Sequence, residues 1–154
     1  MRPGAVATVA SVGREQRDRA DHAAYISAVI GALQSRGVRM TDAAVTTSET
    51  GCREAMLLLR ADEDAFAAES PEELAARWDE DHGWRLNPGY PITSGSSFWE
   101  GTEVLPAPDA VAAWVVVMLT YPALAAAHEQ VQFRDHGVID PDFEARLAKY
   151  APGS

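Results

Sequence analysis

Eighteen consecutive residues, 110–127, carry no charge, and this run is the strongest constraint on how the chain can fold. About 18 apolar residues are the lower limit for a helix that spans a membrane. Seven of these residues are alanine, which is only weakly hydrophobic, and Pro122 interrupts the run. Asp109 and His128 bound it. We therefore expect a helix buried in the core of a soluble protein rather than a membrane span.

Length and composition describe one globular domain. The chain has 154 residues, of which 47% are hydrophobic, and this is enough apolar surface to form a core. Its net charge of −10 disfavours direct binding to nucleic acid or to an anionic membrane, because both need basic side chains. The single cysteine, Cys52, excludes an intrachain disulfide and fits a reducing cytoplasm.

Apolar residues recur with helical spacing in three segments, of which the uncharged run is one. Residues 21–37 carry them on one helical face, with Asp21 as a cap and Gly37 as a terminator. Pro106, Pro108 and Asp109 open the uncharged helix, which Pro122 kinks or restarts. Asp140 and Pro141 begin a last helix. Its apolar face holds Phe143, Leu147 and Tyr150.

A fourth helix is predicted from a capping signal. Ser70, Pro71, Glu72 and Glu73 form a capping box with proline at the first helical position. Leu74 and Trp78 follow at a spacing of four, and Gly83 can end the helix. The pattern predicts a helix through the middle of the chain.

Two pairs of short segments indicate strands. Residues 45–48 and 53–60 form a predicted hairpin around a turn at 49–52. Residues 84–86 and 92–99 form a second pair around the turn cluster 87–91. The short links favour antiparallel pairing.

Together these segments predict an α+β fold, with an antiparallel sheet covered by helices on one face. The expected order is α-β-β-α-β-β-α followed by a C-terminal helix. We expect residues 21–150 to form a single domain and residues 1–20 to form a flexible N-terminal arm.

Three acids and a histidine lie between Trp78 and Trp84. As a structural feature, this segment is a turn between a helix and a strand. As a functional site, it contacts a partner or performs acid–base chemistry around His82. Acids at a helix C-terminus oppose the helix dipole, which is one argument for a functional role. The helix can also end near Trp78, and we favour the structural turn.

The same motif ends an acidic segment. Residues 61–82 contain nine acids and one base, Arg77. Such a segment is either a solvated face or a docking surface for a basic partner. Aromatic residues near the second strand pair add interface character. The predicted partner-binding residues are Asp79, Glu80, Asp81, His82, Trp84 and Trp99.

Other chemistry is not indicated by the sequence. No two of the four histidines have a tight metal-ligand spacing, so we predict no metal site. Arg53 beside Cys52 would lower the pKa of the thiol, but no histidine partner is visible to make it a nucleophile. We assign no catalytic residue and expect no cofactor.

Two resemblances follow from these motifs. The segment from Trp78 to Trp84, followed by a strand and by residues 105–109 opening a helix, resembles a family of uncharacterised actinobacterial proteins. The order of elements, the length and the acidity are similar to the small dimeric chaperones of type III secretion and to bacterial sensory regulators. That second resemblance implies an α+β homodimer with a polypeptide ligand.

We therefore predict a non-enzymatic, cytoplasmic, protein-binding module that is chaperone-like or regulatory and acts on another polypeptide. We expect a homodimer that binds neither nucleic acid directly nor a membrane. One alternative is a small enzyme with an acid–histidine site around His82. Another is an acidic mimic that occupies a nucleic-acid-binding protein.

Overall fold

An antiparallel sheet of five strands in chain order forms the centre of the protein. In the computed structural model, which describes residues 19–61, 74–88, 98–120 and 131–152, every neighbouring pair of strands is antiparallel. The strands are β1 (Val38–Thr47), β2 (Arg53–Ala61), β3 (Leu74–Asp79), β4 (Gly83–Pro88) and β5 (Phe98–Trp99). The predicted α+β class with an antiparallel sheet is confirmed.

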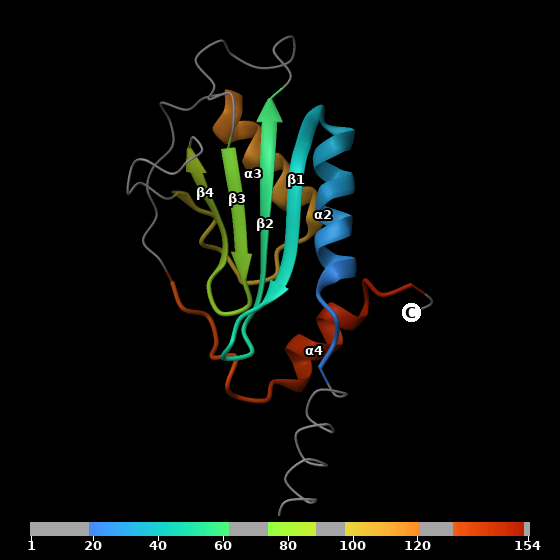
Figure 1. Ribbon diagram of the computed structural model, residues 1–154, viewed down its shortest axis with the longest axis vertical. Coiled ribbons are helices and arrows are strands. Elements are labelled where there is room, and N and C mark those ends of the chain that lie inside the picture. Colours follow the sequence, from blue (N-terminus) through green and yellow to red (C-terminus); the bar gives the residue numbers. More distant parts are fainter. Residues whose placement is uncertain (1–18, 62–73, 89–97, 121–130, 153–154) are drawn as a thin grey trace, which may run out of the picture.

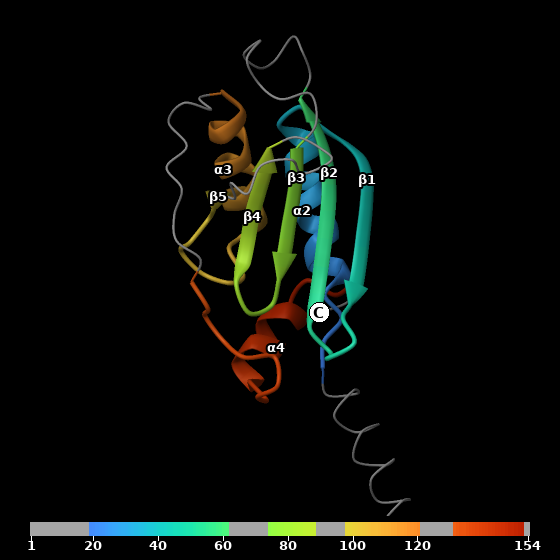
Figure 2. The same cartoon turned by 60° about the vertical axis from the view of Figure 1, so that its left-hand side comes forward.

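Helices cover one face of this sheet (Figure 1). Helix α2 (Ala23–Ser35) precedes the sheet, and α3 (Pro108–Thr120) follows it and packs beside α2. Helix α4 (Pro141–Ala148) lies at the end of the sheet where the β1–β2 and β3–β4 turns are found (Figures 1 and 2). The ends of α2, β2, β3 and α4 therefore meet in one region.

The three described helices begin where the sequence predicts. At the start of α2, Asp21 Oδ1 accepts a hydrogen bond from the backbone N–H of Ala23 at 2.9 Å. Gly37 follows the helix with φ +84°, a conformation that glycine adopts without strain. Asp140 caps α4 by accepting a hydrogen bond from the N–H of Phe143 at 3.1 Å.

Alternating apolar residues bury the covered face of the sheet. Leu57 and Leu59 of β2 are almost fully buried, as are Trp78 of β3 and Trp84 of β4. Their indole N–H groups donate to the carbonyl of Val104 and to the hydroxyl of Tyr25. Buried Trp side chains therefore keep their polar group satisfied.

The prediction of a helix after Ser70 is wrong over residues 74–79, because these residues form β3. Leu74 and Trp78 are four apart and match a helical face, but Leu74, Ala76 and Trp78 also match one face of a strand. Strand β3 pairs with β2 on one side and with β4 on the other, and these pairings decide for the strand. The capping box itself lies outside the described residues.

Two other strand predictions differ in extent. The predicted strand at 45–48 begins earlier, at Val38, because the whole of β1 pairs along β2. Of the predicted strand 92–99, only Phe98–Trp99 falls within the described residues.

The uncharged run forms α3 through residue 120. Its buried residues are Val111, Ala112, Val115 and Leu119. Residues 121–127, including the predicted kink at Pro122, lie outside the described part of the chain. Among the described helices, none has the length and hydrophobicity needed to cross a membrane.

Candidate functional site

The motif between the two tryptophans forms the tight β3–β4 turn. Asp79 Oδ1 accepts hydrogen bonds from the backbone N–H groups of Asp81 and His82 at 3.0 and 2.9 Å, which closes the turn. The same oxygen lies 2.9 Å from His82 Nδ1. Gly83 has φ +81°, and a Cβ at that position would lie 2.9 Å from the carbonyl oxygen of Glu103. Only glycine fits at this position.

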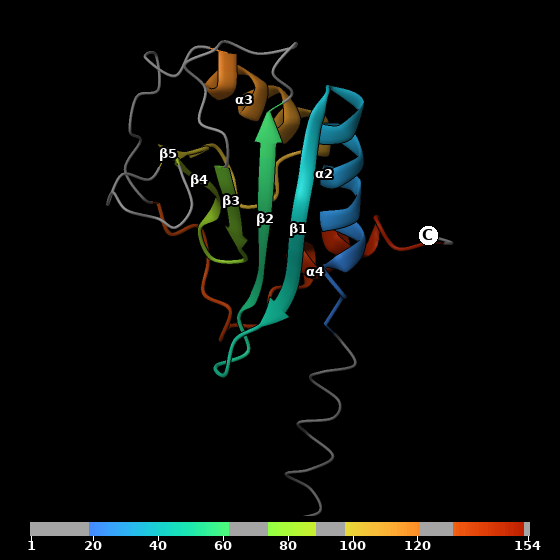
Figure 3. The same ribbon diagram turned by 45° about the horizontal axis from the view of Figure 1, so that its top comes forward.

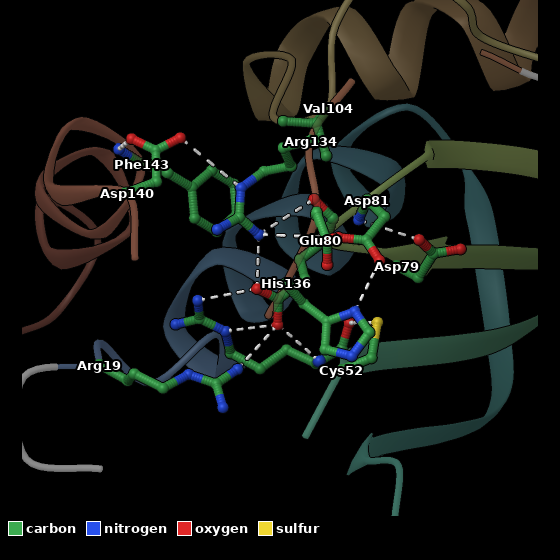
Figure 4. A network of polar contacts seen from close by, with 12 residues as sticks. Arg19, Cys52, Asp79, Glu80, Asp81, Val104, Arg134, His136, Asp140 and Phe143 are labelled. Carbon is green, nitrogen blue, oxygen red and sulfur yellow. Dashed lines mark hydrogen bonds and ion pairs between the residues drawn. The ribbon is translucent and has the colours of Figure 1, made fainter. Parts of the chain in front are cut away.

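Glu80 points inward from this turn and is completely buried. Its carboxylate accepts three hydrogen bonds from Arg53, through the backbone N–H, Nε and Nη2, at 2.6–3.0 Å. Arg134 Nη1 donates to Glu80 Oε1 at 2.5 Å, and Arg19 Nη2 donates to Oε2 at 2.9 Å (Figure 4). Burial raises the pKa of the Glu80 carboxyl, but the hydrogen bonds from Arg53 and Arg134 outweigh it and lower the pKa to about 2. Glu80 is therefore ionised under physiological conditions.

Glu80 and the arginines that bind it form an ionic cluster, and Arg53 extends this cluster to Glu144 of α4. The Nη1 and Nη2 atoms of Arg53 donate to Glu144 at 2.8 and 2.5 Å, and Nη1 also donates to the carbonyl of Ala20. The Arg134 guanidinium lies 4.0 Å from the ring centroid of Phe143, a cation–π distance. Segments far apart in the sequence are thus joined by charge-assisted hydrogen bonds.

Arg19 and Ala20 are part of this cluster, although the sequence analysis places both in the N-terminal arm. Besides its bond to Glu80, Arg19 donates to the carbonyl of Gly51 at 2.6 Å. The N–H of Ala20 donates to Glu144 at 2.7 Å. The remainder of the predicted arm, residues 1–18, lies outside the described residues.

A second group of polar side chains adjoins the ionic cluster. Cys52 Sγ, a carboxylate oxygen of Asp81 and a ring nitrogen of His136 all lie within 4.8 Å of one another. His136 Nδ1 is 2.7 Å from Asp81 Oδ2, and this hydrogen bond raises the pKa of the imidazole. Cys52 and Asp81 are buried, and His136 is half-buried. These three residue types are ligands of transition metals.

The pKa of the Cys52 thiol is raised, whereas the sequence predicts that it is lowered. Burial and the acids of the β3–β4 turn, Asp81 first among them, raise its pKa to about 12. The effect predicted for Arg53 does not occur, because the Arg53 guanidinium is already paired with Glu80 and Glu144. Without a cation, the thiol therefore stays protonated.

His136 also lines a cavity of about 310 Å³ beside the cluster. Charged side chains from three segments form much of its wall. They include Arg19, Arg134, Asp140 and Glu144.

A different site lies on the sheet face opposite the helices (Figure 2). Successive side chains of a strand alternate between the two faces. Since Leu57 and Leu59 are buried in the core, Met56 and Arg60 lie on the opposite face, which we call the uncovered face because no helix among the described residues covers it. Cross-strand partners share a face, so the register adds three arginines to it. The uncovered-face arginines are Arg39, Arg60, Arg77 and Arg85.

These arginines form two directly opposed pairs, Arg39 with Arg60 and Arg77 with Arg85. Arg77 of β3 pairs with Arg85 of β4, and like charges in this relation are destabilising. Burial, followed by the charge of Arg77, lowers the pKa of Arg85. In the next row, Glu54 pairs with Asp79. Both rows line a groove of about 360 Å³.

The structure separates the predicted partner-binding residues. Asp79 and His82 are half-buried in the turn, whereas Glu80, Asp81 and Trp84 are buried. Trp99 belongs to β5, opposite Arg85. Any partner that contacts the turn from outside therefore meets Asp79 and His82, while Glu80 and Trp84 contact the protein interior. His82 lines neither of the two cavities.

Sequence reasoning missed Arg19, Arg53, Arg134 and His136. They are brought to the turn from segments up to 61 positions away, and no spacing along the chain signals this meeting. The helix dipole gave no valid signal for these cations, because residues 74–79 form a strand and the three acids do not lie at a helix end.

The fold and these contacts define a small α+β protein with an antiparallel sheet and a buried ionic cluster at its hairpin end. Residues 25–117 match a family of unknown function, DUF6292. The match covers more than half of the chain, so the chain belongs to this family. The predicted membership of an uncharacterised family is confirmed. No curated protein and no solved structure matches the chain.

Proposed function

We propose that this protein is a non-enzymatic, chaperone-like or regulatory module that binds an acidic segment of another polypeptide on the uncovered face of its sheet. The observation that carries the proposal is the gathering of four arginines on one face of a chain whose net charge is −10. Arg77 and Arg85 lie directly opposite each other, and a further carboxylate from a bound peptide near both of them would offset the repulsion between these like charges.

An extended peptide suits this surface. It places alternate side chains on one face, at the same spacing as the strands below it. Carboxylates at alternate positions then meet the arginines, and the half-buried Met56 offers apolar contact between them.

The predicted basic partner of the acidic segment 61–82 is a separate proposal. Within the described residues of that segment, Glu80 already binds arginines of this chain and Asp81 is hydrogen-bonded to His136. The arginine-bearing face therefore supports an acidic partner better than the turn supports a basic one.

We also infer that the protein acts as a homodimer in the cytoplasm. Strand β1 is an edge of the sheet, ten residues long, and nothing among the described residues pairs with its outer side (Figure 3). Residues 43–47 of β1 carry no charge, although charged side chains usually protect such edges. Antiparallel pairing of β1 from one protomer with β1 of its partner would join the two sheets, so that their uncovered faces form one continuous surface. The single thiol fits a reducing compartment.

Peptide binding tests the proposed function. The probe is a fluorescein-labelled, extended ten-residue peptide with glutamate at every second position, and its counterpart carries lysine instead. We expect fluorescence anisotropy to show binding of the glutamate peptide only, weakening as salt screens the charges. Replacing Arg77 and Arg85 together by Gln should weaken binding by about tenfold or more, since each lost charged hydrogen bond contributes about 1.5–3 kcal/mol.

A charge-matched control uses exposed cations away from this face. Arg36→Gln combined with Lys149→Gln removes the same net charge, and peptide binding should be unchanged. Equal binding of both peptides, or no effect of the Arg77 and Arg85 changes, would contradict the proposal. Tighter binding of a single-stranded oligonucleotide than of the glutamate peptide would replace it with nucleic-acid recognition.

A further inference from the structure

The side chains of Cys52, Asp81 and His136 combine three features of a metal site. Their donor atoms lie within 4.8 Å of one another, they are different donor types, and each comes from a different segment. Cys52 precedes β2, Asp81 lies in the β3–β4 turn, and His136 lies before α4 (Figure 4). The segment that carries His136 is anchored to the turn, because the N–H of Phe133 donates to the carbonyl of Asp81 at 2.8 Å.

An independent observation concerns the second carboxylate oxygen of Asp81. This residue is 7% exposed, and its Oδ1 atom has no hydrogen-bond partner among the described residues. The closest cation, Arg134 Nη1, is 3.9 Å away. A buried carboxylate oxygen without a donor is costly. The protein therefore keeps an unsatisfied acceptor beside a thiol and an imidazole.

We propose that Cys52, Asp81 and His136 bind a divalent transition-metal ion of the zinc type. Zinc takes thiolate, imidazole and carboxylate ligands at about 2.0–2.3 Å, so its ligand atoms lie less than about 4.6 Å apart. A small rotation of these side chains brings all three donors to bonding distance. One thiolate and one carboxylate balance the charge of the ion, and the thiol proton leaves to solvent on binding. The hydrogen bond between His136 Nδ1 and Asp81 Oδ2 breaks, and its proton moves to Nε2 or to solvent so that Nδ1 can bind the ion.

The surroundings favour this ion over a simple structural role for the three residues. The guanidinium of Arg53 is paired with Glu80 and Glu144, and that of Arg134 is paired with Glu80 and lies near Asp140, so these groups do not repel a cation at full strength. Three protein ligands leave a fourth position of tetrahedral zinc for water. His136 also lines the cavity of about 310 Å³, which supplies a route for the ion and for that water.

Cobalt(II) is the probe for this site because its spectrum reports on the ligands. Chelator-treated full-length protein is titrated with Co²⁺ and followed by visible and near-ultraviolet absorption. We expect one ion per chain, tetrahedral visible bands and a thiolate-to-cobalt charge-transfer band. Since Cys52 is the only cysteine in the chain, that band can arise only from Cys52. Zn²⁺ should displace the cobalt and raise the melting temperature.

Variants separate the site from adventitious binding. Cys52→Ser and Cys52→Ala should each abolish the charge-transfer band, and Asp81→Asn and His136→Gln should weaken Co²⁺ binding by at least about tenfold. His82→Gln is the matched control, because His82 lies in the same turn but its ring contacts Asp79 instead. Its affinity for Co²⁺ should equal that of wild type.

Circular dichroism of each variant without metal checks that the fold is retained. If one cysteine variant fails to fold, the other supplies the comparison, and the wild-type spectrum tests the proposal without any variant. Absence of the thiolate band in wild type would overturn it. So would equal Co²⁺ affinity of wild type and the folded His136→Gln protein.

Discussion

Glu80 is the residue whose burial would cost this fold most if its partners were absent. Moving a carboxylate out of water costs several kcal/mol unless charged donors replace the lost hydration. Arg53, Arg134 and Arg19 provide those donors, and Arg53 contributes three of the hydrogen bonds. The acid that looks most suited to an exposed docking surface thus links the turn to distant segments.

Glu80→Gln tests this role at the level of one residue. We expect a loss of about 3–5 kcal/mol in the free energy of unfolding, because Arg53 and Arg134 lose the buried carboxylate that both bind, and Glu144 and Asp140 compensate their charge only in part. The control is Glu103→Gln, which removes an exposed ion pair with Arg146 and should cost no more than about 1 kcal/mol. Urea denaturation of the three proteins measures both values. Similar midpoints for the two variants would place Glu80 among ordinary surface acids.

At the level of elements, glycines mark where backbone geometry decides the structure. Gly83 joins β3 to β4 in the left-handed region and lies against the backbone of residues 103 and 104. Gly31 lies inside α2, and a Cβ there would meet nothing within 4 Å. The first glycine is required by the turn, whereas the second only weakens its helix.

Alanine substitutions should therefore have opposite effects at the two positions. Gly83→Ala should destabilise by about 1–3 kcal/mol or more, because φ +81° and the 2.9 Å approach to Glu103 both resist a Cβ. Gly31→Ala should stabilise by about 0.5–1 kcal/mol, since alanine loses less conformational entropy in a helix. Thermal and urea unfolding of both variants measure the difference. A destabilised Gly31→Ala protein would show that helix propensity does not limit α2.

At the level of the whole molecule, helices protect one face of the sheet and leave the other face and the β1 edge without cover among the described residues. An edge strand with few charges pairs readily with another strand. The uncovered arginines are on the same sheet, so dimerisation through β1 would extend the surface that holds a peptide.

If the protein is a homodimer that pairs through β1, its mass in solution should be that of two chains, and a substitution in β1 should disrupt it. Light scattering should give the mass of two chains, and Val45→Lys should shift the protein toward monomer, because lysine on an edge strand opposes pairing. Val45 is 40% exposed, and Val117 of α3 is 50% exposed, so Val117→Lys is a matched control that should remain dimeric. A wild-type mass of one chain at every concentration tested would exclude the dimer.

Local chemistry accounts for the elements that the sequence predicted correctly. Helices α2, α3 and α4 have strong apolar periodicity or caps, and these signals act within a few residues. The β1–β2 hairpin follows from β-branched and apolar runs around a short turn. Trp78, which the sequence places on the apolar face of its segment, is 2% exposed.

Long-range contacts account for what the sequence could not show. The segment from Leu74 to Trp78 fits both a helix and a strand, and only pairing with β2 and β4 selects the strand. The buried cluster around Glu80 and the meeting of Cys52 with Asp81 and His136 depend on how distant segments pack. The sequence by itself therefore determined the α+β class and most element positions, because those follow from periodicity and capping. The tertiary structure alone decided which charges are buried together, because that depends on contacts between residues far apart in the chain.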